Sequence, residues 1–452
     1  MTNNNFSEKE NNNKTANNHI DLSKKDNDKK KIYNAISEID DDLIEEARPK
    51  KSEKKRPDFR KWMAAAAAIL VFILGVPFLL NLTNLMPGFD EKQAGADPAE
   101  VDRKDQQAQS SALEGQISRS DNYGPHLAVN YPGAYAFEDY ETRQEIREQN
   151  PLSEDFLRAV NDFSFRTAAA VLSENQAGEN ANYSPLSLYY ALAIAGSGAG
   201  SETAVELLDL LGTEDAATLN DQSGNLYRRL YFDNEIGKFQ MANSLWLDND
   251  FNGQPIEYKD DFVKNAAENY YASSHSVDFS DPETATAMAG WVADNTNGTL
   301  QPEVEIDSEQ IFSIINTVYF RDQWIVRFDA KKTEPGIFHL VNGEEVEIDF
   351  MHQIFGTAGF TVGDGFTRAG LSLKNGGTMH FILPDEGVSP YELISAPEKL
   401  EKVLSGGEQL WGEVVWQIPK FDFDTKLDLI QILQKLGINN AFTPEADFSG
   451  IT

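Results

Sequence analysis

The pattern of apolar and polar residues divides the chain into four segments. Residues 1–61 are mostly polar and show one helical stripe, at 32–47. Residues 62–82 are apolar throughout, and residues 83–150 are polar again without a regular period. From 151 to 452, helix-like and strand-like periods follow one another, which predicts a globular domain.

The apolar run 62–82 reads WMAAAAAILVFILGVPFLLNL and contains no charged residue. At ~1.5 Å per residue, a helix of this length crosses a hydrocarbon core of ~30 Å. Eight basic residues stand between Arg48 and Lys61, whereas Lys92 is the one basic residue in the 20 positions after the run. Because basic flanks stay in the cytoplasm, we expect a single-pass anchor in the cell membrane, with the N-terminus cytoplasmic and the later residues extracellular.

A cleaved leader is the alternative reading of this run. Ala94-Gly95-Ala96 resembles a signal-peptidase site. However, 61 residues would then precede the apolar core, and the site lies well past that core. The sequence therefore favours an uncleaved transmembrane helix.

The polar segments beside the run are predicted to be extensions. The tail 1–61 is predicted to be mostly disordered, because it is rich in Asn and Lys. Its stripe at 32–47 is either a solvated helix leading into the anchor or a docking helix for a cytoplasmic partner. Residues 83–150 are acidic and rich in Gln, Ala and Ser, which predicts an extracellular linker.

The segment 151–452 is predicted to be one α+β domain, with many helices around a large, mostly antiparallel sheet. The stretch at 311–320, IFSIINTVYF, is apolar on both faces, which predicts a central strand covered on both sides. The helical periods lie at 151–172, 184–198, 201–212, 258–271, 282–296, 390–404 and 426–436. The strand-like runs lie at 240–248, 310–320, 344–350, 378–384 and 412–421.

Charge and composition exclude several functions. The formal net charge is −34; residues 1–61 carry 15 basic and 13 acidic side chains, a net of +2, so the rest carries −36. Nucleic-acid binding needs clustered Lys and Arg, which the acidic part lacks. Cysteine is absent, which excludes disulfides, thiol catalysis and zinc thiolate sites.

A search for catalytic and ligand-binding motifs finds no candidate. The six histidines show no metal-binding spacing, and no nucleophile elbow occurs. The stretch GSGAGS (196–201) lacks the lysine of a phosphate-binding loop, and we interpret it as a helix-to-helix turn that needs positive φ. We therefore expect no enzyme activity, no metal and no cofactor.

A series of short motifs in one fixed order covers about 300 residues, and it resembles the serpin family of serine protease inhibitors. The motifs are NANYSPLSLYYALAIAGSGAGSET (180–203), ANSLWL (242–247), VDF (277–279), WVADNTNGTL (291–300), NTVYFRDQWIVRFDAKKT (316–333), MHQ (351–353), ILP (382–384), IPKF (418–421) and LQKLGINNAFTPEADFSGIT (433–452). Ala289 and Arg321-Asp322 depart from the family pattern.

The resemblance implies site residues for strand insertion into the main sheet. It places a polar cluster under the centre of that sheet and a tryptophan near its top, where insertion begins. The cluster residues are Asn180, Ser184, Ser187 and Asn316, and the tryptophan is Trp324. From the residues alone, the four polar side chains are helix caps or partners of buried backbone groups, and Trp324 is a core aromatic.

The resemblance also implies a function. Serpins offer a reactive loop to a protease and insert the cleaved loop into the sheet, which traps the protease. In the family this loop follows the turn found here at 447–452, so we expect this chain to lack the loop and the last strands. The chain is then either a fragment of a longer protein, which we favour, or a truncated product. The expectation is a cell-surface inhibitor of serine or cysteine proteases, of a membrane-anchored bacterial type; the alternative is a non-inhibitory surface binding or adhesion module.

Overall fold

The computed structural model describes residues 70–71, 127–174, 180–251, 253–340 and 342–452. The predicted tail 1–61, its stripe at 32–47 and the run 62–82, apart from Leu70 and Val71, lie outside these residues. Among the residues that are described, no helix is both long and apolar enough to cross a membrane. The anchor remains a prediction.

The first of the two larger sheets is built on the antiparallel pair β3 and β7. This pair runs from Lys238 opposite Arg321 to Leu247 opposite Phe312. On the far side of β3, β6 pairs in parallel and β2 forms a short hairpin, while β1 pairs in parallel with β7. The described strands of this sheet are β1 (Leu70–Val71), β2 (Phe232–Asp233), β3 (Lys238–Asp248), β6 (Ala272–Val277) and β7 (Phe312–Arg321).

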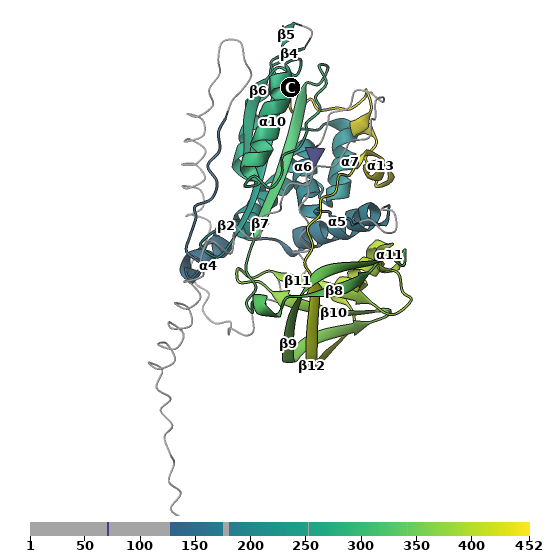
Figure 1. Cartoon of the computed structure of the whole chain (residues 1–452). Helices are drawn as coiled ribbons and strands as arrows, with labels where there is room; N and C mark the ends of the chain where they lie inside the picture. Colours follow the sequence, from purple (N-terminus) through teal and green to yellow (C-terminus); the bar gives the residue numbers. More distant parts are fainter. Residues whose placement is uncertain (1–69, 72–126, 175–179, 252, 341) are drawn as a thin grey trace, which may run out of the picture. The chain divides into compact units, whose positions relative to one another are not determined.

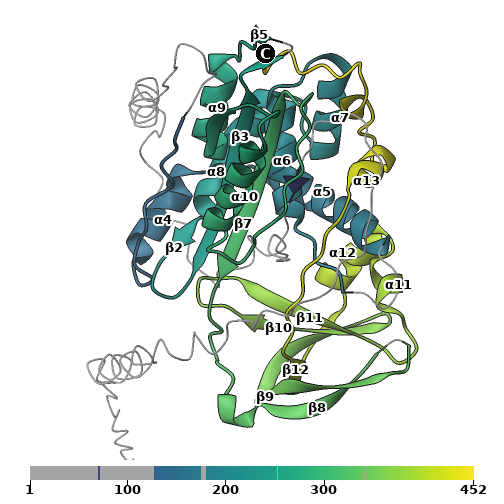
Figure 2. The same cartoon turned by 45° about the horizontal axis from the view of Figure 1, so that its top comes forward.

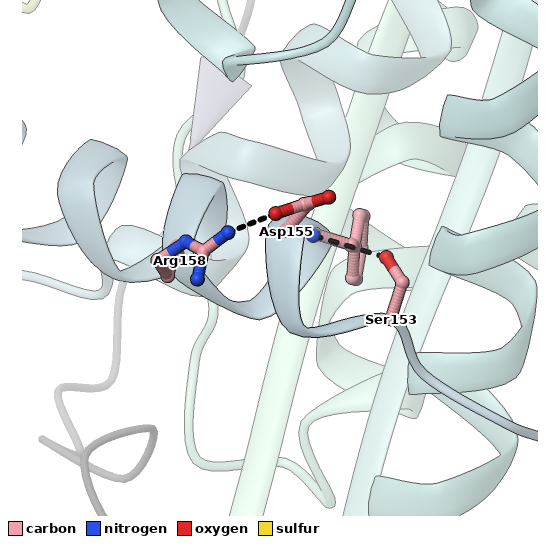
Figure 3. A network of polar contacts seen from close by, with 4 residues as sticks. Ser153, Asp155 and Arg158 are labelled. Carbon is pink, nitrogen blue, oxygen red and sulfur yellow. Dashed lines mark hydrogen bonds and ion pairs between the residues drawn. The ribbon is translucent and has the colours of Figure 1, made fainter.

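Helices surround this sheet, and several of them begin at a residue whose side chain caps them. At the start of α5, Ser153 Oγ accepts a hydrogen bond from the backbone N of Phe156 at 3.1 Å, and Asp155 pairs with Arg158 (Figure 3). The cap contributes ~1 kcal/mol, whereas the exposed ion pair adds little. The described α-helices are α4 (Tyr140–Gln149), α5 (Glu154–Ser173), α6 (Pro185–Ser197), α7 (Ser201–Leu211), α8 (Ala216–Leu230), α9 (Asp260–Tyr270), α10 (Pro282–Asn295), α11 (Pro390–Ile394), α12 (Pro397–Ser405) and α13 (Ile430–Lys435).

β3 and β7 are covered on both faces. Leu245 of β3 and Ile314 of β7 belong to the main core, which the large helices share. Their neighbours Trp246 and Ile315 belong to a smaller cluster with α10. Because successive side chains of a strand point to opposite faces, α10 lies on the face opposite the main helices. Figures 1 and 2 show these layers, with α10 on one side of β7 and α6 on the other.

The second large sheet has the order β11-β10-β9-β12, and β8 pairs with the first part of β9. Its pairs are all antiparallel. The bounds are β8 (Glu334–His339), β9 (Glu345–Gly363), β10 (Phe366–Ser372), β11 (Thr378–Pro384) and β12 (Glu408–Pro419). Smaller elements are the hairpin β4 (Asp250–Phe251) with β5 (Gln254–Pro255) and the 3₁₀ turns η3 (Ala330–Lys332) and η4 (Asn440–Phe442).

The structure confirms the α+β class and the mostly antiparallel strand pairing, but it moves several boundaries. The predicted helix 390–404 is two helices, because Pro397 forces an extended backbone on Ala396 (φ −151°, ψ 151°). The predicted helix 426–436 shortens to α13. Within the segment predicted to be a linker, the described residues include a β-bridge at Leu127 and the helix α4.

The buried carboxyl of Asp248 makes stability depend on pH. Asp248 ends β3 and is 6% exposed. Burial raises the pKa of its carboxyl to about 6, and the carboxylates of Asp278 and Asp250 act in the same direction, against the backbone amides that donate to it. Because the folded pKa exceeds the unfolded value of ~3.9, this group's stabilising contribution is complete below pH ~4 and is lost as pH rises through 6.

We therefore expect Asp248→Asn to raise the free energy of unfolding at pH 7.5 by up to about 2–3 kcal/mol and to change it far less at pH 4.5. Urea unfolding of both proteins at the two pH values measures the difference. A variant that is less stable than the parent at pH 7.5 would contradict the assignment.

Candidate functional site

The start of α6 forms one part of the candidate site. Ser184 is its N-cap, and its Oγ accepts a hydrogen bond from the backbone N of Ser187 at 3.2 Å. Pro185 takes the first helical position, where its missing N–H leaves no bond unmade. Both serines are buried, and α6 packs against β7. The Ser-Pro-x-Ser sequence thus places two hydroxyls under the first sheet.

A chain of buried amides crosses the sheet. Asn316 of β7 lies directly opposite Asn243 of β3. Asn316 Nδ2 donates to Asn243 Oδ1 at 2.7 Å, and Asn243 Nδ2 donates to the carbonyl oxygen of Tyr270 at 2.6 Å. Both asparagines are fully buried. The pair fixes the register of the two strands, because a slip of one residue would leave both amides unpaired in the core.

Three buried polar atoms near these amides have no hydrogen-bond partner among the described residues. Ser187 Oγ, Asn316 Oδ1 and Thr317 Oγ1 form no hydrogen bond with the part of the chain that the structure describes. A buried polar atom left unpaired costs ~1–3 kcal/mol. The middle of β7 and the start of α6 are therefore deeply buried and incompletely satisfied.

One edge of β7 is largely open. Its β3 edge is paired along the whole strand. On the opposite edge, the described residues supply only β1, with Leu70 opposite Ile315 and Val71 opposite Asn316. The other backbone groups of that edge are placed to pair with an added strand, which is how sheets accept extended peptides.

The other two predicted site residues lie outside this region. Asn180 is exposed and lies in an irregular stretch before α6. Trp324 follows β7 and packs edge-to-face on Phe328, with ring centroids 6.5 Å apart. Both aromatics contact a cluster of the second sheet that contains Trp416. The structure therefore gathers Ser184, Ser187 and Asn316 at the first sheet, but not Asn180 or Trp324.

Asn243 was not predicted as a site residue, although its position in the sequence indicates a buried polar contact. Asn243 and the neighbouring Ser244 are the polar residues in the middle of the buried run QMANSLWLD (240–248). An amide inside such a strand needs an internal partner. That requirement would have marked it as the partner of another buried amide.

The turn 447–452 docks on the connection between α6 and α7. The backbone N of Gly200 donates to Asp447 O at 2.8 Å, and the Ser201 hydroxyl donates to the Asp447 carboxylate at 2.5 Å. The Ser201 hydroxyl, helped by Ser449, lowers the pKa of Asp447 to about 2. Asp447 thus places a carboxylate at the start of α7, whose own N-cap residue, Gly200, has no side chain to cap the helix. The turn and the start of β7 line a cavity of about 730 Å³.

This docking corrects the interpretation of the glycine-rich stretch 196–201. The stretch does contain a positive φ, but it falls on Ser201 (φ 50°), whereas Gly198 and Gly200 have φ values of −109° and −127°. A Cβ on Gly198 would lie 2.4 Å from Ile451 Cγ1, and one on Gly200 would lie 2.7 Å from the Asp447 carboxylate. These glycines are required because the turn approaches their backbone closely.

Residues 158–452 match the family model described as serpin (serine protease inhibitor). The chain belongs to the serpin family. This serpin is 30% identical over 307 residues to Serpin-ZXA of Oryza sativa subsp. japonica, with 64% of this chain and 76% of the relative covered. It is 26% identical over 306 residues to the plasma serine protease inhibitor of Mus musculus, with 64% and 72% covered.

The serpin fold is also found by comparison with solved structures. The thermophilic serpin tengpin in its native state is 26% identical to this chain and superposes with a TM-score of 0.60, covering 72% of this chain and 78% of tengpin. The emu ovalbumin structure superposes with the same TM-score at 19% identity, covering 66% and 81%. The family match thus includes all the buried residues of the candidate site.

We expect Asn316→Ala to lower the free energy of unfolding by about 2–4 kcal/mol, because it leaves Asn243 Oδ1 unpaired and opens a small cavity. Asn180→Ala, at an exposed position, is the matched control and should change stability by less than about 0.5 kcal/mol. Urea unfolding compares the two. Equal effects would show that the buried amide chain contributes nothing particular to the sheet.

Proposed function

We propose that this serpin inhibits serine proteases by accepting a cleaved loop as an extra strand beside β7. The observation that carries the proposal is that, among the described residues, the edge of β7 away from β3 pairs only with the two residues of β1, beside buried groups that have no hydrogen-bond partner there. Each ladder hydrogen bond gained by a new strand contributes ~0.5–1.5 kcal/mol, and an inserted side chain can also satisfy Ser187 or Asn316. The mouse relative is named as a serine protease inhibitor, which supports the same partner.

In this proposal, the protease is trapped because insertion of the loop is faster than hydrolysis of the ester. The protease's serine Oγ attacks the scissile carbonyl, the peptide C–N bond breaks, and the loop is left esterified to the enzyme. Insertion then moves the ester together with the protease before water can hydrolyse it. A cysteine protease forms a thioester by the same route, so both protease classes fit. The strand gains hydrogen bonds and burial on insertion, which makes the movement favourable.

The test uses the protein expressed from its complete reading frame, because the family's reactive loop follows the turn 447–452. Mixed with a trypsin-like or a subtilisin-like protease, it should give a complex that survives a denaturing gel, since an ester bond joins the two proteins. The same protease with its catalytic serine changed to alanine is the control and should give no such band.

Cleavage of the serpin by a protease that stays fully active would contradict inhibition. Stable binding without cleavage would favour the non-inhibitory surface module. Both outcomes are read from the same gel together with a residual-activity assay.

We also propose that residues 62–82 anchor this serpin in the cell membrane, with residues 1–61 in the cytoplasm and the serpin domain outside. The proposal rests on the uncharged run and on the basic residues that precede it. β1 lies within the same run. A membrane helix and the pairing of Leu70 and Val71 with β7 therefore exclude one another, and the location of the run decides between them.

Protease added to intact cells should remove the residues beyond about 90 and spare the tail 1–61, because basic flanks stay inside. Antibodies against each part, on gels of washed membranes, measure this. Recovery of the whole domain in the medium, cleaved after Ala96, would overturn the anchored arrangement.

A further inference from the structure

Residues 127–149 precede the family match and pack on the serpin body; we call them the N-terminal clasp. Leu127 begins it and is fully buried. Its backbone N donates to Ser274 O at 3.1 Å, and its carbonyl accepts from Ser274 N at 2.9 Å. This reciprocal pair is an antiparallel bridge to β6. The clasp therefore covers part of the outer edge of the first sheet.

The middle of the clasp connects to α10. The Tyr131 hydroxyl donates to Asn295 Oδ1, in the last turn of α10, at 3.1 Å. The ring of Tyr131 stacks on Tyr231, with centroids 6.4 Å apart and planes 9° apart. Burial raises the pKa of Tyr131 to about 12, so the hydroxyl keeps its proton and remains a donor. One side chain thus joins α10 to the segment after α8.

The far end of the clasp is fastened as well. Phe137 N donates to the Glu235 carboxylate at 3.3 Å, and Asn150, the residue directly after the clasp, accepts a hydrogen bond at Oδ1 from Arg228 Nε of α8. Within the clasp, Arg143 donates to the carbonyl oxygen of Phe137 at 3.1 Å. The guanidinium of Arg143 also lies 5.6–6.0 Å from three ring centroids, at a distance where cation–π attraction holds a segment together. These rings are Tyr135, Phe137 and Tyr140.

α10 itself is held by few buried side chains. Of its 14 residues, Thr284, Met288 and Val292 are buried. The two apolar ones contact a small cluster on β3 and β7 that is separate from the main core. Beyond its last turn, Asn297 Nδ2 donates to the Tyr319 hydroxyl at 3.4 Å, which is long for a hydrogen bond. Of these two side-chain hydrogen bonds at the end of α10, the one from the Tyr131 hydroxyl to Asn295 is shorter than the one from Asn297 to Tyr319.

We infer that the N-terminal clasp holds α10 against the first sheet, and that release of the clasp is what lets α10 leave β3 and β7. Gly133 and Ala134, between Tyr131 and the Arg143 cluster, are exposed, so cleavage there would separate the two fastened ends. Pulling on the chain before Leu127 would act on the same contacts. The inference depends on the fold alone and stands whether or not the protein inhibits a protease.

Hydrogen–deuterium exchange of the full chain in detergent, read by mass spectrometry, tests the clasp. Tyr131→Phe keeps the stacked ring and removes the hydroxyl's bond to Asn295 of α10 together with its contact to Gln240 of β3. The bond to Asn295 is the one that reaches α10, so the amides of α10 should exchange ~5-fold faster, the effect of one net hydrogen bond. Leu127→Asp places an unpaired charge at a fully buried position and should accelerate α10 and β6 together. Tyr258→Phe is the matched control: it removes a phenol bond of 2.6 Å to Ile311 O, outside the clasp, and should leave α10 unchanged.

Unchanged exchange of α10 in Tyr131→Phe would overturn the inference, and so would equal acceleration of α10 by Tyr258→Phe. If Leu127→Asp does not fold, Tyr131→Phe decides alone. A failure here leaves the gel assay for protease inhibition unaffected, so the two proposals are tested separately.

Discussion

β3 and β7 run antiparallel through the middle of the first sheet, and both must be covered by protein on their two faces. This constraint accounts for most of the other features. Alternate side chains go to the main core on one face and to the α10 cluster on the other. Polar side chains in these strands cannot reach water, so Asn243 and Asn316 pair with one another across the ladder. Where no partner is in reach among the described residues, as at Thr317, the hydroxyl stays unsatisfied.

The same constraint connects stability with function. A sheet that admits another strand needs a strand whose edge is open and whose surroundings improve when that edge is filled. For the insertion proposed above, β7 is the candidate strand, because among the described residues its β3 edge is fully paired, its other edge pairs only with β1, and polar atoms without partners lie at its centre. In that proposal, the free energy gained on insertion comes from a few buried groups rather than from the whole core. Such local deficits are usual where a protein has to change its conformation.

The apolar pattern of the sequence was sufficient for the fold class and for the central strand, because both depend on long runs with one clear period. It failed for α8, whose sequence AATLNDQSGNLYRRL has low helix propensity; the helix forms because Leu219, Leu226 and Tyr227 are buried on one side. Ser184, Ser187 and Asn316 were predicted as site residues from motif order, and the structure places them together at the first sheet. The partner of Asn316 depends on the register between β3 and β7, and the position of Trp324 depends on how the second sheet packs. Neither can be predicted from the residues near it in the sequence. The close approach of Ile451 to Gly198 could not be predicted from the sequence either, because the two residues lie in segments that are far apart along the chain.

The docking of the turn 447–452 on the connection between α6 and α7 also has a consequence for the time course of synthesis. Ser201 and Asp447 are 246 positions apart. A ribosome that adds ~5–20 residues per second reaches Asp447 roughly 12 to 50 seconds after it has added Ser201. For that period the newly made α7 lacks the hydrogen bond between Ser201 and the Asp447 carboxylate, and the space that Gly198 keeps free is unfilled. The helices made first must therefore wait without this contact, exposed to chaperones and to other nascent chains, until the turn 447–452 emerges and docks.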